Sequence, residues 1–200
     1  EQAGASLNFF ADEQTNRDLG FWTIPASLFQ SLNSIFVVSF APLFAWLWVK
    51  MGKNEPSALT KMAIGLMLLT IGFFVIAFGV NNVAPGVKVS FLWLTSMYAL
   101  HTWGELCLSP IGLSLVNKLA PFKLASLMMA VWFLANAAAN KLAGVLSALY
   151  PEAGKTTQLL GFKIENLHDF FMVFVIMSGV ASLVLFILSK KFQKLMHGVK

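Results

Sequence analysis

The sequence predicts an all-α membrane protein whose helices cross the bilayer several times. Its 200 residues are 58% hydrophobic and only 12% charged, whereas about 25% of the residues in an ordinary soluble domain are charged. Five charge-poor segments are each long enough, as helices, to cross a hydrocarbon layer of about 30 Å. These segments lie at roughly 24–49, 62–80, 90–117, 124–149 and 169–189. The whole chain, 1–200, is therefore expected to form one transmembrane bundle.

The first residues look like the end of a further helix. Residues 1–10 are mostly apolar or small, and the polar stretch from Asp12 to Asp18 follows them as an expected loop. Neither an initiator methionine nor a signal-peptide pattern precedes this stretch. We therefore expect a fragment that begins inside a preceding helix, of which 1–10 is the remnant.

The positive residues are distributed unevenly between the two sets of loops. One set carries nine lysines, which are Lys50, Lys53, Lys61, Lys118, Lys123, Lys190, Lys191, Lys194 and Lys200. The other set carries only Arg17, Lys88, Lys155 and Lys163. Because positive loops are retained on the cytoplasmic side during insertion, the C-terminus is expected to be cytoplasmic. This topology also accounts for the net charge of +5, so nucleic acid is not an expected partner.

The sequence carries none of the short motifs that mark common enzymes. It has no Gly-rich phosphate loop, no pair of zinc ligands and no nucleophile elbow. Cys107 is the only cysteine, so neither a disulfide nor a cysteine metal site is expected. We therefore expect no catalytic residues, no metal and no organic cofactor, and an enzyme is not the predicted class.

Glu105 stands out among the acidic residues because it lies alone inside a complete predicted span. A carboxylate at membrane depth is costly, and it normally faces a bundle interior or a wet cavity, where it pairs with a cation or stays protonated. Glu105 is therefore the leading candidate for a functional group. The alternative is a structural carboxyl group that a neighbouring helix satisfies.

Helical spacing places other polar residues near Glu105. His101 and Ser109 lie four residues before and after it, so the three side chains share one face of a helix. His101 is either a proton relay or a buried structural histidine. In the first complete span, Gln30 and Asn33 lie three residues apart and face one side, and Asn33 is the better candidate for lining a cavity.

A second polar stripe is expected in the fourth span. Trp132, Asn136 and Asn140 follow one another at four-residue intervals, which places them on one helix face. Trp132 lies well inside its span rather than at an interface, and this position favours a role in a binding pocket. The two asparagines either line the same pocket or form structural hydrogen bonds between helices.

Three runs of sequence point to a known family. They read GELCLSPIGLS from Gly104 to Ser114, KLAP at 118–121 and SLMMAVWFLANA at 126–137. These runs resemble the proton-dependent oligopeptide transporters of bacteria. Glu1 and Gln2 are similar to the end of that family's seventh helix, and FQSLN at 29–33 is similar to part of its eighth. The residue after this run is serine, where the family often has proline.

The resemblance implies the C-terminal six-helix bundle of a major facilitator fold, with five complete helices and the end of a sixth. An N-terminal half of the same transporter would be its partner, and the two halves would alternate between outward-facing and inward-facing states. The loop near residues 80–90 is too short for the large extracellular domain of animal relatives. A multi-pass protein of the bacterial cytoplasmic (inner) membrane is therefore implied.

The resemblance also implies roles for individual residues. Glu105 would meet the amino terminus of a di- or tripeptide, with Asn33 in the same region and Trp132 lining the pocket. Ser109 and Asn136 are further candidates for this substrate-binding site. Glu1 matches an acidic residue of helix seven that takes part in proton-coupled gating.

The implied function is symport of di- and tripeptides with protons as the coupling ion, across a lipid bilayer and without another cofactor. Two alternatives stay open. One is a proton-conducting or structural subunit of a multisubunit membrane complex. The other is a related transporter for a different solute, because one fold serves many functions. Glu105 suits a peptide amine, and this argues against nitrate as the solute.

Overall fold

The computed structural model describes residues 2–84, 86–151, 157–159 and 161–195. The helices in this part of the chain are η1 (Gln2–Gly4), α1 (Ser6–Glu13), α2 (Ala26–Met51), η2 (Gly52–Asn54), α3 (Ala58–Gly79), α4 (Phe91–Leu119), η3 (Phe122–Leu124), α5 (Ala125–Ser147) and α6 (Leu167–Leu195). The strands are β1 (Thr15–Asn16), β2 (Val89–Ser90), β3 (Thr157–Leu159) and β4 (Phe162–Ile164). The five long helices lie where the five spans were predicted, so the all-α architecture is confirmed.

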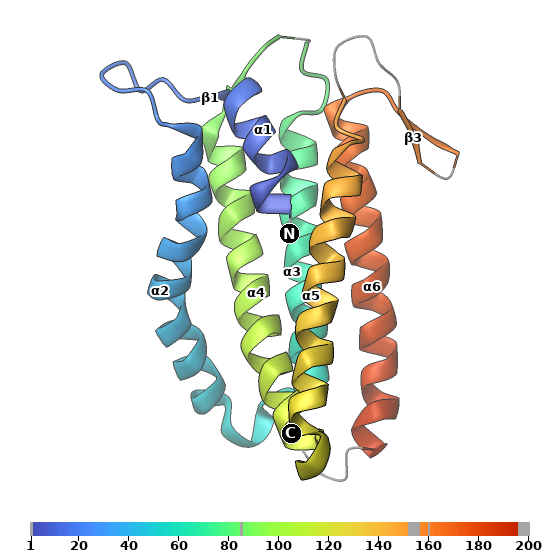
Figure 1. The fold of residues 1–200 in the computed structure, drawn as a ribbon. Coiled ribbons are helices and arrows are strands. Elements are labelled where there is room, and N and C mark those ends of the chain that lie inside the picture. Colours follow the sequence, from blue (N-terminus) through green and yellow to red (C-terminus); the bar gives the residue numbers. More distant parts are fainter. Residues whose placement is uncertain (1, 85, 152–156, 160, 196–200) are drawn as a thin grey trace.

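The long helices α2 to α6 run side by side, and the short α1 lies against one end of the bundle (Figure 1). The most extensive packing joins α3 to α4 and α3 to α6, and α2 packs against α4. α5 touches the other long helices mainly through α4, and less extensively. α3 is therefore the centre of the packing, whereas α2 and α5 stand at its sides.

The buried core lies toward the end of the bundle that holds α1. Leu7 and Phe10 of α1 are fully buried, and the Phe10 ring meets Phe171 of α6 edge-on, with centroids 5.4 Å apart. The Tyr98 hydroxyl of α4 donates a hydrogen bond of 3.3 Å to the Ala3 carbonyl oxygen. These contacts fix η1 and α1 on the bundle, and η1 forms one wall of the cavity described below.

α3 and α4 approach each other closely at two glycines. A Cβ atom on Gly104 would lie 2.5 Å from the Gly65 carbonyl oxygen, and one on Gly65 would lie 2.6 Å from the Gly104 carbonyl oxygen. Small residues commonly let helix backbones touch in this way inside membranes. The two glycines therefore set the distance between the central helix and the helix that carries Glu105.

Four helical segments are long and apolar enough to cross a membrane, namely Ala26–Asn54, Ala58–Gly79, Phe122–Ser147 and Leu167–Phe192. α4 is the fifth predicted span, and its 29 residues give it sufficient length. It falls outside the apolar set because polar side chains such as His101, Thr102 and Glu105 interrupt it. α4 packs between α2 and α3, so this polar face lies inside the bundle rather than against lipid.

The loops differ from the prediction in three places. The expected loop from Asp12 to Asp18 begins later, because α1 continues to Glu13, and Thr15–Asn16 then pairs in parallel with Val89–Ser90. A short antiparallel hairpin joins β3 to β4. Strands of two or three residues are too short to show a period-2 pattern, so sequence periodicity does not reveal them. Glu1 lies outside the described residues.

Candidate functional site

Glu105 lies on a polar cavity of about 550 Å³ between α2, α4, α5 and η1. The side chains with polar atoms around it are Gln30, Asn33, Ser34, His101, Glu105 and Asn140. The remaining wall consists of small residues, Ala3, Gly4, Ala5, Ala143 and Gly144. Glu105 and Asn33 are both half-buried. Two side chains that the sequence singled out, from helices far apart in the chain, therefore meet at one cavity.

A chain of two hydrogen bonds leads to the Glu105 carboxylate. The Asn33 side-chain amide donates to Glu105 Oε2 over 3.1 Å. The Thr102 hydroxyl donates to Asn33 Oδ1 over 2.6 Å. Thr102 is fully buried, so it braces Asn33 from inside the bundle while the carboxylate faces the cavity. This arrangement suits a carboxylate that must be held in place and yet remain open to a ligand.

Thr102 is the member of this chain that sequence reasoning missed. It lies three residues before Glu105 in α4, a spacing that brings two side chains to the same side of a helix. His101 and Ser109 lie at the four-residue spacing, which also brings side chains to one side of a helix. Threonine in a helix usually bonds to its own backbone, and for that reason a threonine within an apolar run attracts no attention.

η1 is tied to α5 through Gln2, and this tie closes one side of the cavity. The Gln2 side chain donates to the Ala143 carbonyl oxygen over 3.2 Å, and its own Oε1 accepts a hydrogen bond of 2.6 Å from Ser6. Gln2 is buried. α5 therefore reaches the rest of the bundle partly through polar contacts with η1.

The other predicted substrate-binding residues lie elsewhere. Ser109 is exposed and is not part of the described cavity lining. Asn136 is also exposed, and its backbone carbonyl oxygen accepts a hydrogen bond of 3.1 Å from the Asn140 side chain. Asn140 is thus the residue of this stripe that reaches the cavity. Roles for Ser109 and Asn136 in substrate binding stay predictions.

Trp132 of α5 packs near the C-terminal end of α4. Its ring packs directly on Gly112, where any Cβ atom would collide with it. It lines a separate apolar cavity of about 380 Å³ with residues such as Leu115 and Met128. Gly112 is two helical turns from Glu105, which corresponds to about 10 Å along the axis. The structure therefore does not bring Trp132 into the described lining of the Glu105 cavity, and its pocket role stays a prediction.

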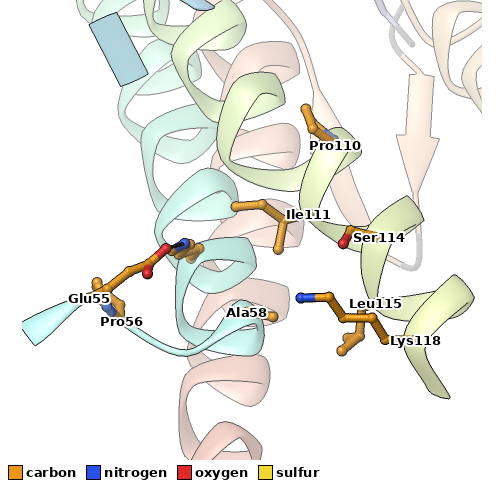
Figure 2. Close-up of a pocket in the computed structure, with 9 residues that line it drawn as sticks. Glu55, Pro56, Ala58, Pro110, Ile111, Ser114, Leu115 and Lys118 are labelled. Carbon is orange, nitrogen blue, oxygen red and sulfur yellow. Dashed lines mark hydrogen bonds and ion pairs between the residues drawn. The ribbon is translucent and has the colours of Figure 1, made fainter. Parts of the chain in front are cut away.

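A further polar cavity of about 370 Å³ lies where α3 begins and α4 ends (Figure 2). Lys61 pairs there with Glu55, and its ammonium group lies 4.7 Å from the centre of the Trp48 ring. Figure 2 shows Lys118 of α4 on the opposite wall. The Glu55 carboxylate of this second cavity is held by an ion pair, whereas the Glu105 carboxylate accepts its described hydrogen bond from a neutral amide.

The described residues contain no group of three or more His, Cys, Asp or Glu side chains placed to hold a metal ion. The chemistry that the Glu105 cavity offers is accordingly that of one carboxylate, one imidazole and several neutral amides. Such a set can bind an ammonium group and can exchange a proton with it or with water.

The membrane-spanning bundle around a polar, carboxylate-bearing cavity defines the class, which is a multi-pass membrane protein with an internal polar site. The family follows from comparison with known proteins. A family model described as PTR2, POT family, matches residues 1–162. The chain therefore belongs to the POT family, a family of transporters, as the sequence runs at 104–137 indicated.

Curated relatives are similar over much of this chain. The chain is 42% identical to "Uncharacterized transporter YclF" of Bacillus subtilis, over 78% of this chain and 32% of that protein. It is 39% identical to "Peptide transporter YePEPT" of Yersinia enterocolitica, over 73% of this chain and 29% of that protein. It is 32% identical to a "Di-/tripeptide transporter" of Lactococcus lactis, over 100% of this chain and 39% of that protein. The chain thus spans about a third of the length of these relatives.

Solved structures share the fold. The chain matches a crystal structure of a variant of "peptide transporter POT" in complex with alafosfalin, with a TM-score of 0.84, 34% identity, and coverage of 96% of this chain and 37% of that one. It also matches a POT family transporter in complex with 5-aminolevulinic acid, with a TM-score of 0.80, 31% identity, and coverage of 95% and 37%.

Proposed function

We propose that this chain is the C-terminal half of a transporter that carries di- and tripeptides across the bacterial cytoplasmic membrane together with protons. The observation that carries the proposal is the Glu105 cavity, where Asn33 holds a carboxylate at membrane depth. The names of the Yersinia and Lactococcus relatives support peptides as the cargo. Membership of a transporter family also weighs against a structural subunit of a larger complex.

Peptide recognition would begin with the amino terminus. A zwitterionic peptide presents an ammonium group with three hydrogen-bond donors, and a carboxylate is its best partner. Glu105 is half-buried on the cavity, so an ammonium ion there would pair in surroundings much less polar than water. The amides of Gln30 and Asn140 line the same cavity and offer hydrogen bonds to the peptide backbone. The peptide carboxylate would point toward the N-terminal half of the transporter.

Proton coupling would follow from the same carboxylate. A proton on Glu105 removes the charge that holds the peptide ammonium group, so the proton and the peptide compete or alternate at this residue. Alternating access of the two halves would then be driven by differential binding to the two states, because a ligand shifts an equilibrium only by its difference in affinity. We propose that Glu1, next to the buried Gln2, contributes to gating.

We propose further that the end of the bundle at which α3 and α5 begin is cytoplasmic. The helix ends there carry Lys50, Lys53, Lys61, Lys118 and Lys123, whereas the opposite end carries Arg17, Lys88 and Lys163 (Figure 1). This asymmetry follows the rule that positive residues stay on the cytoplasmic side. α6 ends at the same positive end, which would place the C-terminus in the cytoplasm.

Uptake by the full-length transporter in liposomes tests this function. We expect uptake of a labelled dipeptide to rise with an inward proton gradient, and Glu105→Gln to abolish the gradient-driven part. Glu165→Gln is the matched control, because Glu165 is exposed and lies outside the cavity lining. Uptake that ignores both the gradient and Glu105→Gln would contradict the proposal.

A further inference from the structure

The Thr102 hydroxyl has more acceptors than it can serve. Its oxygen lies 2.6 Å from Asn33 Oδ1 and 2.8 Å from the Tyr98 carbonyl oxygen. A hydroxyl group carries one hydrogen, so it can donate fully to only one of these oxygens, although it can also accept from a donor. Because Thr102 is fully buried, water does not supply the second hydrogen-bond donor at this position.

Two complete hydrogen-bond patterns therefore exist for Thr102, Asn33 and Glu105. In the first, Thr102 donates to Asn33 Oδ1, and the Asn33 amide donates to an ionised Glu105. In the second, the amide is turned by 180°, Thr102 donates to the Tyr98 carbonyl oxygen, and the Asn33 amide donates to the Thr102 oxygen. Asn33 Oδ1 then faces Glu105, and among these three residues a protonated Glu105 carboxyl group is the one that can donate to it.

The distances fit the first pattern. The separation of 2.6 Å between Thr102 and Asn33 is typical of an O–H···O hydrogen bond. The separation of 3.1 Å between Asn33 and Glu105 is typical of an N–H···O hydrogen bond. Both fit an amide whose oxygen faces Thr102 and whose nitrogen faces an ionised Glu105.

We infer that Thr102 is a positioning residue that couples the protonation of Glu105 to the orientation of the Asn33 amide. This inference rests on the proposed function, in which the ionised Glu105 binds the peptide ammonium group. Thr102 holds the amide in the orientation that favours the ionised carboxylate. Protonation of Glu105 reverses the direction of the Thr102–Asn33 and Asn33–Glu105 hydrogen bonds and turns the Thr102 hydroxyl toward the Tyr98 carbonyl oxygen. Thr102 therefore influences the pH range in which the cavity accepts a peptide.

The surroundings leave few other groups to produce this effect. Of the titratable side chains in the described cavity lining, His101 is the other one, and it lies on α4 itself. α2 and α5 contribute neutral amides, and η1 with the residue that follows it contributes Ala3, Gly4 and Ala5. Lys141 of α5 is exposed and is not part of this lining.

Dipeptide binding to the full-length transporter, measured against pH, tests the role of Thr102. In Thr102→Val the side chain keeps its shape but the amide loses the donor that orients it. We expect the pH below which binding is lost to move up by about half to one pH unit. This shift corresponds to the net free energy of one neutral hydrogen bond. Binding at high pH should stay within about threefold, because the carboxylate remains. Thr102→Ser keeps the hydroxyl and should keep the wild-type profile.

Two results would overturn the inference. One is a Thr102→Val profile identical to that of the wild type, and the other is a Thr102→Ser profile shifted as far as that of Thr102→Val. A wild-type protein that binds no dipeptide would instead remove the proposed function. The outcomes for the proposed function and for Thr102 are therefore distinguishable.

Infrared difference spectra of the wild-type protein between neutral and acidic pH do not depend on the folding of the Thr102 variants. We expect a carboxyl band that disappears in Glu105→Gln to arise together with a shift in an asparagine side-chain amide band. A carboxyl band that arises without any amide change would overturn the reversal of the hydrogen bonds, whether or not peptides bind.

Discussion

Two carboxylates of this bundle are held in opposite ways, and the difference bears on what each can do. Glu55 pairs with Lys61, whose side chain is 10% exposed and also lies against Trp48. Glu105 receives a neutral amide instead. An ion pair locks both charges, whereas an amide leaves the carboxylate able to take a cation or a proton. The first carboxylate is therefore structural, and the second is suited to function.

Glu55→Gln tests the structural role of the ion pair. Removal of one partner leaves the Lys61 charge buried and uncompensated, which is costly. Because the Glu55 side chain is 35% exposed, water screens part of the effect, and we expect a loss of about 1–2 kcal/mol. Thermal unfolding of the full-length protein in detergent measures it. Glu165→Gln should leave the midpoint unchanged, and equal midpoints for all three proteins would contradict this role.

Tyr150 is a residue whose hydroxyl group contributes little to the fold. Its ring packs on Phe9 of α1 and on Phe170 of α6, with centroids 6.1 Å and 5.4 Å away. Its hydroxyl group is buried and has no hydrogen-bond partner among the described residues. Burial raises the pKa of Tyr150 above its usual value, and the nearby charge of Glu13 raises it further.

The raised pKa of Tyr150 predicts a loss of stability in alkali. The contribution of the buried, protonated Tyr150 to the free energy of unfolding is fully present below about pH 10, the unfolded pKa. It is lost as the pH rises above that value, because Tyr150 in the unfolded chain releases its proton first. Tyr150→Phe keeps both ring contacts and should match the wild type near pH 7, yet lose less stability near pH 11. Thermal unfolding at the two pH values measures this. A parallel loss in both proteins would contradict the account.

At the scale of elements, the crossing of α3 and α4 decides where Glu105 lies. Gly104→Ala would place a methyl group 2.5 Å from the Gly65 carbonyl oxygen, and a backbone atom cannot yield as a flexible side chain can. We expect the helices to separate, with a loss of about 1–3 kcal/mol in stability. The midpoint of thermal unfolding and the affinity for a dipeptide should both fall.

The matched control for this crossing is Gly144→Ala in α5. A Cβ atom at Gly144 meets nothing within 4 Å, and alanine favours a helix by about 1 kcal/mol over glycine. This variant should be at least as stable as the wild type. If Gly104→Ala were equally well tolerated, the close approach of α3 and α4 would not limit the bundle.

The sequence was sufficient to predict the elements that a membrane dictates. Long apolar runs locate helices because a span requires them, and Glu105 is conspicuous because a lone carboxylate in such a run is costly. The sequence does not predict the level along the helix axes at which side chains of two neighbouring helices meet. Four-residue spacing places Trp132 and Asn140 on one face of α5, yet contacts between helices bring Asn140 to the Glu105 cavity and Trp132 to Gly112. Thr102 is found only once its partner on α2 is known.

At the scale of the whole molecule, α2 and α5 are the helices that the bundle leaves most open. The most apolar window of each has no buried residue, and both helices border the Glu105 cavity. Exposed apolar faces on spanning helices must be covered by lipid or by protein. We expect the N-terminal half of the transporter to cover the cavity side of α2 and α5.

The proposed topology is testable by labelling of single cysteines in full-length protein freed of its native cysteines. Lys163→Cys lies in β4 and Lys53→Cys in η2, at opposite ends of the bundle. A membrane-impermeant maleimide should label Lys163→Cys in intact cells, and Lys53→Cys only after the membrane is permeabilised. The reverse pattern would place the C-terminus outside the cytoplasm.

The central claim is that Glu105 binds the amino terminus of a peptide, and calorimetric titration of the full-length transporter tests it most directly. A dipeptide and its N-acetylated analogue are compared on the wild type and on Glu105→Gln. We predict that the wild type binds the free dipeptide at least about tenfold more tightly, as expected for a charge-assisted hydrogen bond, and that Glu105→Gln removes this preference. A Glu105→Gln protein that keeps the full preference for the free amino terminus would contradict the claim.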